Sequence, residues 1–380
     1  MTEPFIPYGR QRVDESDIEA VVAVLRSDWL TTGPLVERFE RAVADFVGAA
    51  EGVAVSSGTA ALHAALHAIG IGPGDEVIVP PMTFAATANA VVYLGGTPVF
   101  ADVDPRTLLL DPARVEEKIS SRTKAVVAVD YAGQPADYRA LRTICRRHGL
   151  ILVADACHSL GAGDSDGPCG TLADLSVFSF HPVKPITTGE GGMVVTDNAG
   201  LAQRMRRFRN HGILTDHHQR LERGAWFYEM VELGCNYRLT DIQCALGLSQ
   251  LAHLRQWLER RRQMAAYYDA AFKDTPIRPI QARPGATHGY HLYVVQVPER
   301  DRVFAALREL GIGVNVHYIP VHLHPYYRQR FATNEGLCPV AESAYRRILS
   351  LPVFPGLDET VLARIVETLR WVVSSQNRDE

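Results

Sequence analysis

Between about residues 50 and 200, short β-branched runs alternate with helical stretches, and this pattern constrains the fold more than any other feature of the sequence. A buried strand followed by a helix and a further buried strand is typical of βαβ units, which build a parallel sheet. We therefore expect an α/β fold with a large, mostly parallel sheet. The predicted strands are Val53–Val55, Glu76–Val79, Pro98–Val103, Ala125–Val129, Ile151–Ala154, Leu175–Phe180 and Gly192–Thr196, with helices at Ala60–Ile69, Thr83–Tyr93 and Asp137–His148.

The second part of the chain repeats the α/β pattern on a smaller scale. A long arginine-rich helix is predicted over Leu251–Phe272. We expect a large domain over residues 1–250, in which residues 1–14 form an arm toward the substrate site, and a small C-terminal domain over residues 251–380. The elements predicted for the small domain are the strand Tyr290–Val297, the helix Arg302–Leu310, the strand Gly313–Tyr318 and a last helix at Glu359–Val373.

Composition excludes several classes of function. The 380 residues carry a formal net charge of −4 with interspersed charges, so no basic surface for nucleic acid is expected. The first residues lack the apolar core of a signal peptide, and no apolar run is long enough to span a bilayer, so we expect a cytoplasmic protein without membrane contact. The six cysteines form no C-x-x-C pair, which indicates neither a disulfide framework nor a metal site.

The chain is poor in lysine, and one lysine stands apart from the others. Lys118, Lys124 and Lys273 occur in charged or polar surroundings, whereas Lys184 follows a buried strand and precedes the glycine-rich run 189–192. A lysine at the end of a buried strand is placed to form a Schiff base with a carbonyl cofactor. An ordinary loop lysine is the alternative.

A carboxylate is expected at the same edge of the sheet. Asp155 follows the apolar run Ile151–Ala154, and open α/β sheets bind ligands at the carboxyl ends of their strands. Asp155 could keep the pyridine nitrogen of pyridoxal phosphate protonated, or it could cap the next helix or form a buried salt bridge.

Three further features favour a phosphate-bearing aromatic cofactor. Ser57, Gly58 and Thr59 open an alanine-rich helix, whose free N–H groups can hold a phosphate, although such a run is also plain capping. Ser179 could add a hydroxyl to the same phosphate, or face solvent. Phe84 could stack on the cofactor ring, or belong to the core.

Four ordered motifs resemble the DegT/StrS family of fold-type I sugar aminotransferases over nearly the whole chain. They are Ser57–Leu62, Asp155–His158, Ser179–Lys184 with Thr187–Gly192, and Asn236–Gln243. The resemblance implies pyridoxal 5′-phosphate as cofactor, with Lys184 as its Schiff-base lysine. Cys157 and Pro185 depart from the usual pattern without removing a chemical group.

The same resemblance implies roles for the other site residues. Asp155 would pair with the pyridine nitrogen, and His158 and Phe84 would flank the ring. Asn236 would reach the phosphate of the partner subunit's cofactor, so that a homodimer shares its active sites. The phosphate would be held by Ser57, Gly58, Thr59 and Ser179, and substrate would be contacted by Tyr8, Leu30, Thr31, Thr32, Gly33, Arg238, His317 and Tyr318.

Within the family, the segments Phe5–Gln11, Ser27–Pro34 and Leu248–Leu251 resemble the 4-aminotransferases of pseudaminic acid biosynthesis. This implies transfer from L-glutamate to C4 of UDP-2-acetamido-2,6-dideoxy-β-L-arabino-hexos-4-ulose. Keto sugars linked to dTDP or GDP are the alternatives, as is a non-catalytic regulator on the same fold. Related sugar dehydratases have histidine in place of the Schiff-base lysine, so Lys184 argues against that activity.

Overall fold

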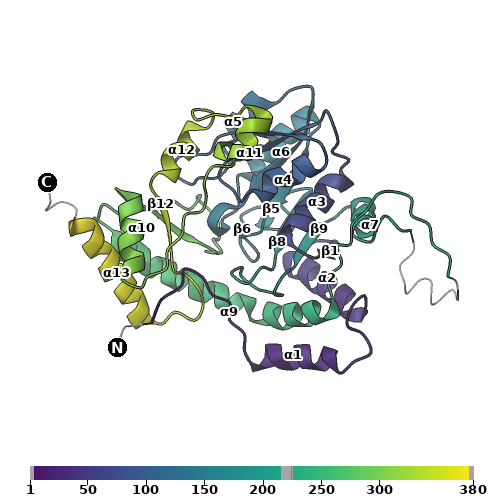
Figure 1. Cartoon of the computed structure of the whole chain (residues 1–380), viewed down its shortest axis with the longest axis horizontal. Helices are drawn as coiled ribbons and strands as arrows, with labels where there is room; N and C mark the ends of the chain where they lie inside the picture. Colours follow the sequence, from purple (N-terminus) through teal and green to yellow (C-terminus); the bar gives the residue numbers. More distant parts are fainter. Residues whose placement is uncertain (1–3, 215–223, 225, 376–380) are drawn as a thin grey trace.

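The structure is a computed structural model that describes residues 4–214, 224 and 226–375. Its centre is a seven-stranded sheet (Figure 1). All neighbouring strands are parallel except at β9, which is antiparallel to both of its neighbours. The strand order is β1 (Glu51–Val55), β9 (Gly192–Thr196), β8 (Leu175–Ser179), β5 (Ile151–Asp155), β4 (Thr123–Val129), β2 (Glu76–Val79) and β3 (Thr97–Phe100). The predicted α/β class and its mostly parallel sheet are confirmed.

Helices cover both faces of this sheet. One core contains α3 (Gly58–Ala68), α4 (Ala86–Tyr93) and α7 (Ala199–Phe208), and the other contains α2 (Pro34–Val47) and α6 (Tyr138–His148). Strand β5 shows why both faces are apolar, because Val153 enters the first core and its neighbours Leu152 and Ala154 enter the second.

The long helix α9 runs over Asp241–Phe272 and therefore begins ten residues before the predicted start at Leu251. A capping box defines its first turn, because the Thr240 hydroxyl accepts from the Gln243 N–H while the Gln243 side chain accepts from the Thr240 N–H. Residue 250, at which we divided the chain, lies inside this helix, and the division itself stays a prediction.

A second sheet has the order β10 (Arg278–Pro279), β11 (Tyr293–Gln296) and β12 (Ile348–Leu351), all antiparallel. Helices α10 (Arg300–Glu309) and α13 (Glu359–Ser374) complete its core. The strand predicted at Gly313–Tyr318 is wrong: this segment makes one isolated bridge, from Asn315 to Ser350, and β12 takes the third place in the sheet.

The remaining elements are short, apart from α1. They are α1 (Glu15–Leu25), α5 (Pro112–Lys118), α11 (Pro325–Phe331), α12 (Pro339–Tyr345), the hairpin β6 (Gly163–Asp164) and β7 (Gly167–Pro168), and the 3-10 turns η1 (Tyr131–Gly133) and η2 (Val321–Leu323). Among the described residues, no helix is long and apolar enough to cross a membrane.

The N-terminal segment lies against the second sheet. The Ile6 N–H donates to the Gly311 carbonyl at 2.9 Å, and the Val353 N–H donates to the Tyr8 carbonyl at 3.2 Å. Tyr8 is thereby held next to His317, with ring centroids 5.3 Å apart.

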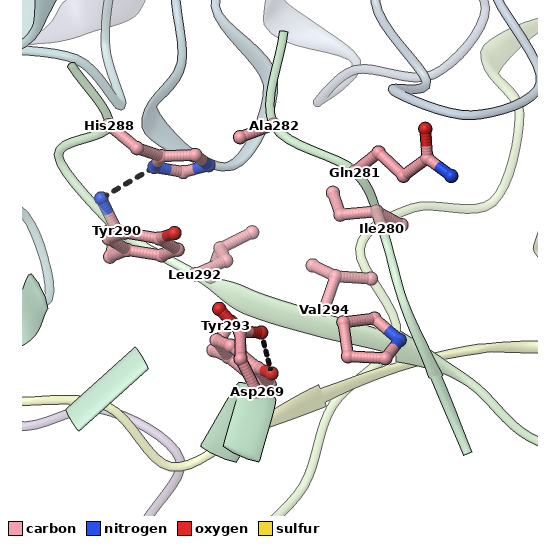
Figure 2. Close-up of a pocket in the computed structure, with 10 residues that line it drawn as sticks. Asp269, Ile280, Gln281, Ala282, His288, Tyr290, Leu292, Tyr293 and Val294 are labelled. Atoms are coloured by element: carbon pink, nitrogen blue, oxygen red, sulfur yellow. Dashed lines mark hydrogen bonds between the residues drawn. The ribbon is translucent and has the colours of Figure 1, made fainter. Parts of the chain in front are cut away.

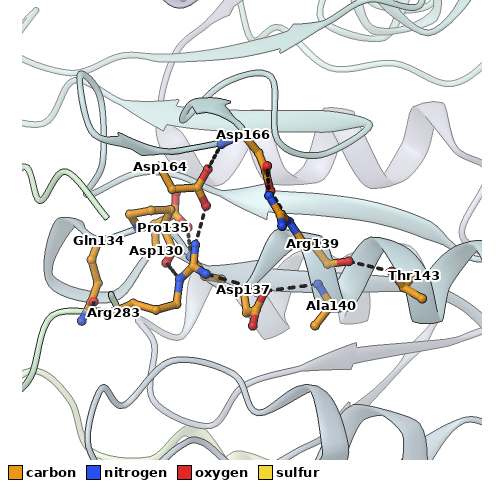
Figure 3. Close-up of polar contacts among 11 residues, drawn as sticks. Asp130, Gln134, Pro135, Asp137, Arg139, Ala140, Thr143, Asp164, Asp166 and Arg283 are labelled. Carbon is orange, nitrogen blue, oxygen red and sulfur yellow. Dashed lines mark hydrogen bonds and ion pairs between the residues drawn. The ribbon is translucent and has the colours of Figure 1, made fainter. Parts of the chain in front are cut away.

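Charged residues tie the β6–β7 hairpin to its surroundings (Figure 3). Arg139 on α6 forms a two-pronged ion pair with Asp166, and Arg283 pairs with Asp164. The Arg283 N–H also donates to the side chain of Gln134 at 2.8 Å. These bonds fasten the segment leading to β11 onto the large sheet, beside the end of β4.

Candidate active site

Lys184 lies in the turn between β8 and β9, where its N–H donates to the His181 carbonyl at 2.9 Å. Its side chain is half-buried, and burial lowers the pKa of its ammonium, while Cys157 and Asp155 nearby act in the opposite direction. Lys124, by contrast, pairs with Asp75 at the surface. Lys184 is therefore the lysine whose surroundings favour the neutral, nucleophilic amine.

Asp155 is the last residue of β5, the strand next to β8 in the sheet. Its side chain is buried, at 6% exposure. One carboxylate oxygen accepts from the Thr87 hydroxyl at 2.7 Å, and the other accepts from the Cys157 N–H at 3.3 Å. Asp155 and Lys184 thus come from neighbouring strands and meet at their carboxyl ends, as predicted for an open α/β sheet.

The start of α3 lies against β8 and leaves no room for a side chain. A Cβ added to Gly58 would be 2.9 Å from the Ser179 Cβ and 3.1 Å from its hydroxyl. Ser57 is the N-cap, and its hydroxyl accepts from the Ala60 N–H at 3.1 Å. The N–H groups of Gly58 and Thr59 belong to the first helical turn, which has no intrahelical acceptors. The missing side chain of Gly58 therefore lets the N–H groups of Gly58 and Thr59 lie next to the Ser179 hydroxyl. We call these three groups the Gly58 cradle.

Three buried histidines surround the lysine. Burial lowers the pKa of His158 and of His291 well below the usual range, and the positive charge of Lys184 acts in the same direction. The same two causes lower the pKa of His317 to about 3. The rings of His158 and His291 are 4.4 Å apart, and each keeps a buried Nδ1 without a hydrogen-bond partner. This part of the site is neutral at physiological pH.

Aromatic groups continue from the histidines toward solvent. The Tyr318 hydroxyl and His158 Nε2 are 3.1 Å apart, and the Phe84 ring lies 6.1 Å from that of Tyr318. Phe84 is 62% exposed, so it lies at an open edge rather than in the core. Tyr8 and His317 pack beside Tyr318.

The other predicted site residues gather around the start of α9. The Asp241 N–H donates to the Leu30 carbonyl at 3.1 Å, and the Asp241 carboxylate accepts from the Gly33 N–H at 2.7 Å. Asn236 is exposed, and its backbone pairs with Asn210. Thr31 forms a β-bridge with Thr240, and the Arg238 guanidinium donates to the Asn210 side chain. Between Thr31 and Gly33, Thr32 has a left-handed φ of 53°.

Comparison with known proteins identifies the family. A model of the DegT/DnrJ/EryC1/StrS aminotransferases matches residues 11–370. The chain belongs to this family. The spore coat polysaccharide biosynthesis protein SpsC of Bacillus subtilis is 41% identical over 379 residues, which cover 97% of each chain.

Solved structures of sugar aminotransferases share the whole fold. A putative sugar aminotransferase of Streptococcus pneumoniae, Spr1654, superposes in its PMP form with a TM-score of 0.93 at 30% identity, over 97% of this chain and 99% of that one. Helicobacter pylori PseC, an aminotransferase involved in the biosynthesis of pseudoaminic acid, superposes with a TM-score of 0.91 at 33% identity, over 98% and 100%. The protein is therefore a fold-type I sugar aminotransferase that depends on pyridoxal phosphate.

Pyridoxal phosphate fits the residues that line this site. The Gly58 cradle offers backbone N–H groups and a hydroxyl to a phosphate. The buried Asp155 carboxylate offers an acceptor to a pyridine N–H. The buried Nδ1 of His158 has no hydrogen-bond partner within the chain, as expected where a bound group completes the site.

The sequence did not reveal several residues of the site. Four such residues are His291, Thr83, Thr87 and Tyr131. The His291 ring packs against His158, and the Tyr131 hydroxyl donates to the His317 carbonyl. The Thr87 hydroxyl bonds to Asp155 and lies 2.7 Å from the Thr83 hydroxyl. The only signal for His291 is its position at the start of a predicted strand, which says nothing of its distance from His158.

Figure 2 shows the residues that line a cavity of about 370 Å³, and neither Lys184 nor Asp155 is among them. Tyr290 lines this cavity, whereas the next residue, His291, packs against His158. The Tyr290 and His288 rings stack at 3.9 Å, and the Tyr293 hydroxyl donates to Asp269 at 2.6 Å. The segment 290–291 therefore separates the active site from this outer cavity.

The buried histidines predict acid sensitivity of the fold. The folded pKa is about 3 for His288 and His317 and is lowered for His158 and His291, against 6.5 for an ordinary histidine. Below that value the unfolded chain binds more protons, so these groups stabilise the fold at neutral pH and lose this contribution as the pH falls. Asp130, whose pKa burial raises to about 6, acts oppositely, but it is one group, whereas burial also lowers the pKa of His63, His67 and His322.

We expect the free energy of unfolding to fall by at least about 2 kcal/mol between neutral pH and a pH of about 5. Urea denaturation across this range measures it. His317→Gln should flatten the dependence, and a stability that is constant or rises toward acid would contradict the assignment of neutral histidines.

Proposed function

We propose that this enzyme transfers the amino group of L-glutamate to C4 of UDP-2-acetamido-2,6-dideoxy-β-L-arabino-hexos-4-ulose. The products are 2-oxoglutarate and the 4-amino sugar. The observation that carries the proposal is the meeting of Lys184 and Asp155 beside the Gly58 cradle, within a chain that belongs to a sugar aminotransferase family.

Lys184 is proposed to move protons. When bound, pyridoxal phosphate withdraws electrons from the carbon that carries the amino group. The Lys184 amine then takes a proton from the donor carbon and, in the second half of the reaction, returns one to C4 of the sugar. Burial favours this role because it lowers the pKa of the ammonium, so that more of the neutral base is present near neutral pH.

Asp155 and the histidines are proposed to set the charge of the site. A buried carboxylate stabilises a proton on the pyridine nitrogen, which strengthens electron withdrawal. His158, held neutral by burial and bonded to Tyr318, would flank the ring without adding positive charge. Phe84, exposed at the open edge, would cover the other side.

The sugar is proposed to enter between two walls. One wall is formed by Tyr8, His317 and Tyr318, which pack together in this chain. The other consists of residues 30–33 and Arg238, which are fixed to the start of α9 and to Asn210. Hydroxyl and amide groups suit the sugar oxygens and the acetamido group, and the guanidinium suits the diphosphate.

The choice of sugar rests on similarity. Residues 5–11, 27–34 and 248–251 resemble enzymes of pseudaminic acid biosynthesis, and PseC of Helicobacter pylori covers 98% of this chain. A keto sugar linked to dTDP or GDP is the alternative. The relative SpsC, which is 41% identical, is named for spore coat polysaccharide biosynthesis, and this name supports a saccharide substrate without specifying the sugar.

A homodimer with shared active sites is part of the proposal. Asn236 is exposed in the described chain, so its amide is available to a second copy. Its neighbour Tyr237 accepts from the Ser56 N–H at 2.9 Å, so Asn236 also lies near the phosphate cradle of its own subunit, and action within one subunit is the alternative.

Substrate choice can be decided by kinetics. We expect kcat/KM for the UDP-linked acetamido sugar to exceed that for dTDP-4-keto-6-deoxyglucose by at least about hundredfold. The reason is that the polar groups of the site that bind the acetamido group have no partner when the substrate lacks it. Release of 2-oxoglutarate from L-glutamate measures both. Equal or better use of the dTDP sugar would overturn the proposed substrate but not the aminotransferase reaction.

A further inference from the structure

Two threonines that no motif singled out form a hydrogen-bonded chain ending on Asp155. The Thr87 hydroxyl is 2.7 Å from one carboxylate oxygen of Asp155 and 2.7 Å from the Thr83 hydroxyl. Thr87 is fully buried and Thr83 is 2% exposed. Water therefore does not compete for these bonds.

The direction of the chain follows from counting protons. An ionised carboxylate only accepts hydrogen bonds, and a threonine hydroxyl has one proton to donate. If Thr87 donates its proton to Asp155, it can only accept from Thr83. The order Thr83 to Thr87 to Asp155 is thus the one that matches a negative charge on Asp155.

The backbone fixes both donors relative to the strand that carries Asp155. Thr87 is in the first turn of α4, with its N–H donating to the Phe84 carbonyl at 3.2 Å, and Thr83 lies four residues earlier in the connection from β2. Strand β2 is two places from β5 in the sheet. The connection that presents Phe84 at the open edge therefore also carries Thr83, and the helix that follows it carries Thr87.

We propose that Thr87 is a positioning residue, which with Thr83 behind it holds the Asp155 carboxylate ionised and in one orientation. This inference rests on the proposed role of Asp155 toward the pyridine nitrogen. A hydroxyl that donates to a carboxylate favours its charged form and fixes its rotamer, and the charged form is the one that stabilises a proton on the cofactor ring.

The test compares Thr87→Val, Thr87→Ser and Thr83→Val in the holoenzyme, using the half-reaction with the amino donor. Thr87→Val keeps the shape and removes the donor. We expect the maximal rate constant of this half-reaction to fall about tenfold, with the half-saturating donor concentration nearly unchanged, as for the loss of one hydrogen bond to a charged group. Thr87→Ser should recover most of the loss, and Thr83→Val should show a smaller one.

A second readout separates positioning from general stability. Nitrogen NMR of cofactor labelled at the pyridine nitrogen reports whether that atom is protonated, and in Thr87→Val we expect the signal to move toward the unprotonated form. The matched control is Thr196→Val, because Thr196 is also buried and its hydroxyl donates to the Asp174 carbonyl at 2.7 Å, away from Asp155. If Thr87→Val behaves as Thr196→Val does in both readouts, the inference is overturned.

Asp155→Asn distinguishes this inference from the proposed function. If Asp155→Asn loses most turnover while Thr87→Val does not, Asp155 acts without the threonines and only the present inference fails. If Asp155→Asn keeps normal turnover and a protonated nitrogen, the proposed role of Asp155 fails, and the threonine inference with it.

Discussion

Lys184→Ala is expected to lose turnover by at least about a thousandfold, because general acid–base transfer and covalent attachment both depend on this amine. The other three lysines occur in charged or polar stretches of the sequence, and Lys124 is paired with Asp75. None is placed to replace Lys184. Turnover with excess cofactor and the saturating keto sugar measures the loss.

Two further measurements make this result specific. After borohydride reduction, the intact mass of the native protein should include the cofactor, and that of Lys184→Ala should not. Lys273→Ala is the matched control, since Lys273 is exposed just after the end of α9. An active Lys184→Ala enzyme would exclude Lys184 as the essential amine and would overturn its assignment as the Schiff-base lysine.

Mixing two inactive variants is expected to restore activity if subunits share their sites. In a dimer of one Lys184→Ala chain and one Asn236→Ala chain, one site has Lys184 from the second chain and Asn236 from the first, so both groups are intact. Random exchange of equal amounts makes half of the dimers mixed, each with one working site, so we expect up to about a quarter of native activity.

The same experiment distinguishes whether Asn236 acts in the active site of the partner subunit or in that of its own subunit. If its amide acts within its own subunit, next to the bond between Tyr237 and Ser56, no site in a mixed dimer is complete and nothing is recovered. The unmixed variants set the background, and labelled chains must first be shown to exchange. Recovery would support the shared site, and its absence after proven exchange would contradict it.

The sheet could be predicted because local sequence and burial agree. Runs such as Glu76–Val79 and Gly192–Thr196 are β-branched, buried on both faces and bounded by turns, and their predicted bounds match the structure. The beginning of α9 could not be predicted in this way. It contains Gly247, a poor helix former, whose missing side chain allows contact with Phe39, because a Cβ there would be 2.6 Å from that ring. Tertiary packing decides this stretch.

The segment 313–318 shows the opposite error. Val314 and Val316 alternate with polar residues as in a strand, but only Asn315 pairs with β12. The chain then leaves the sheet, so that His317 and Tyr318 reach the site. The pattern that predicts a strand cannot distinguish regular pairing from a segment held for its side chains.

The sequence also predicted which residues meet in the site better than which residues support them. The proximity of Lys184, Asp155 and Gly58 could be predicted because strand ends and helix starts are visible in a sequence, whereas the roles of these residues stay predictions. His291 and Thr87 could not, since their contacts depend on how distant elements pack, and neither position has a local pattern that sets it apart.

The length of α9 limits how this enzyme can open and close. Its 32 residues correspond to a rod of about 48 Å. Near one end, Asp241 holds the segment 30–33, and toward the other, Arg261 donates to the carbonyls of Tyr290 and Val353 at 3.0 and 2.8 Å. A swing of the second sheet away from the first would have to bend this rod or break buried bonds to it. We therefore expect sugars to enter and leave by rearrangement of surface loops rather than by a swing of the two sheets.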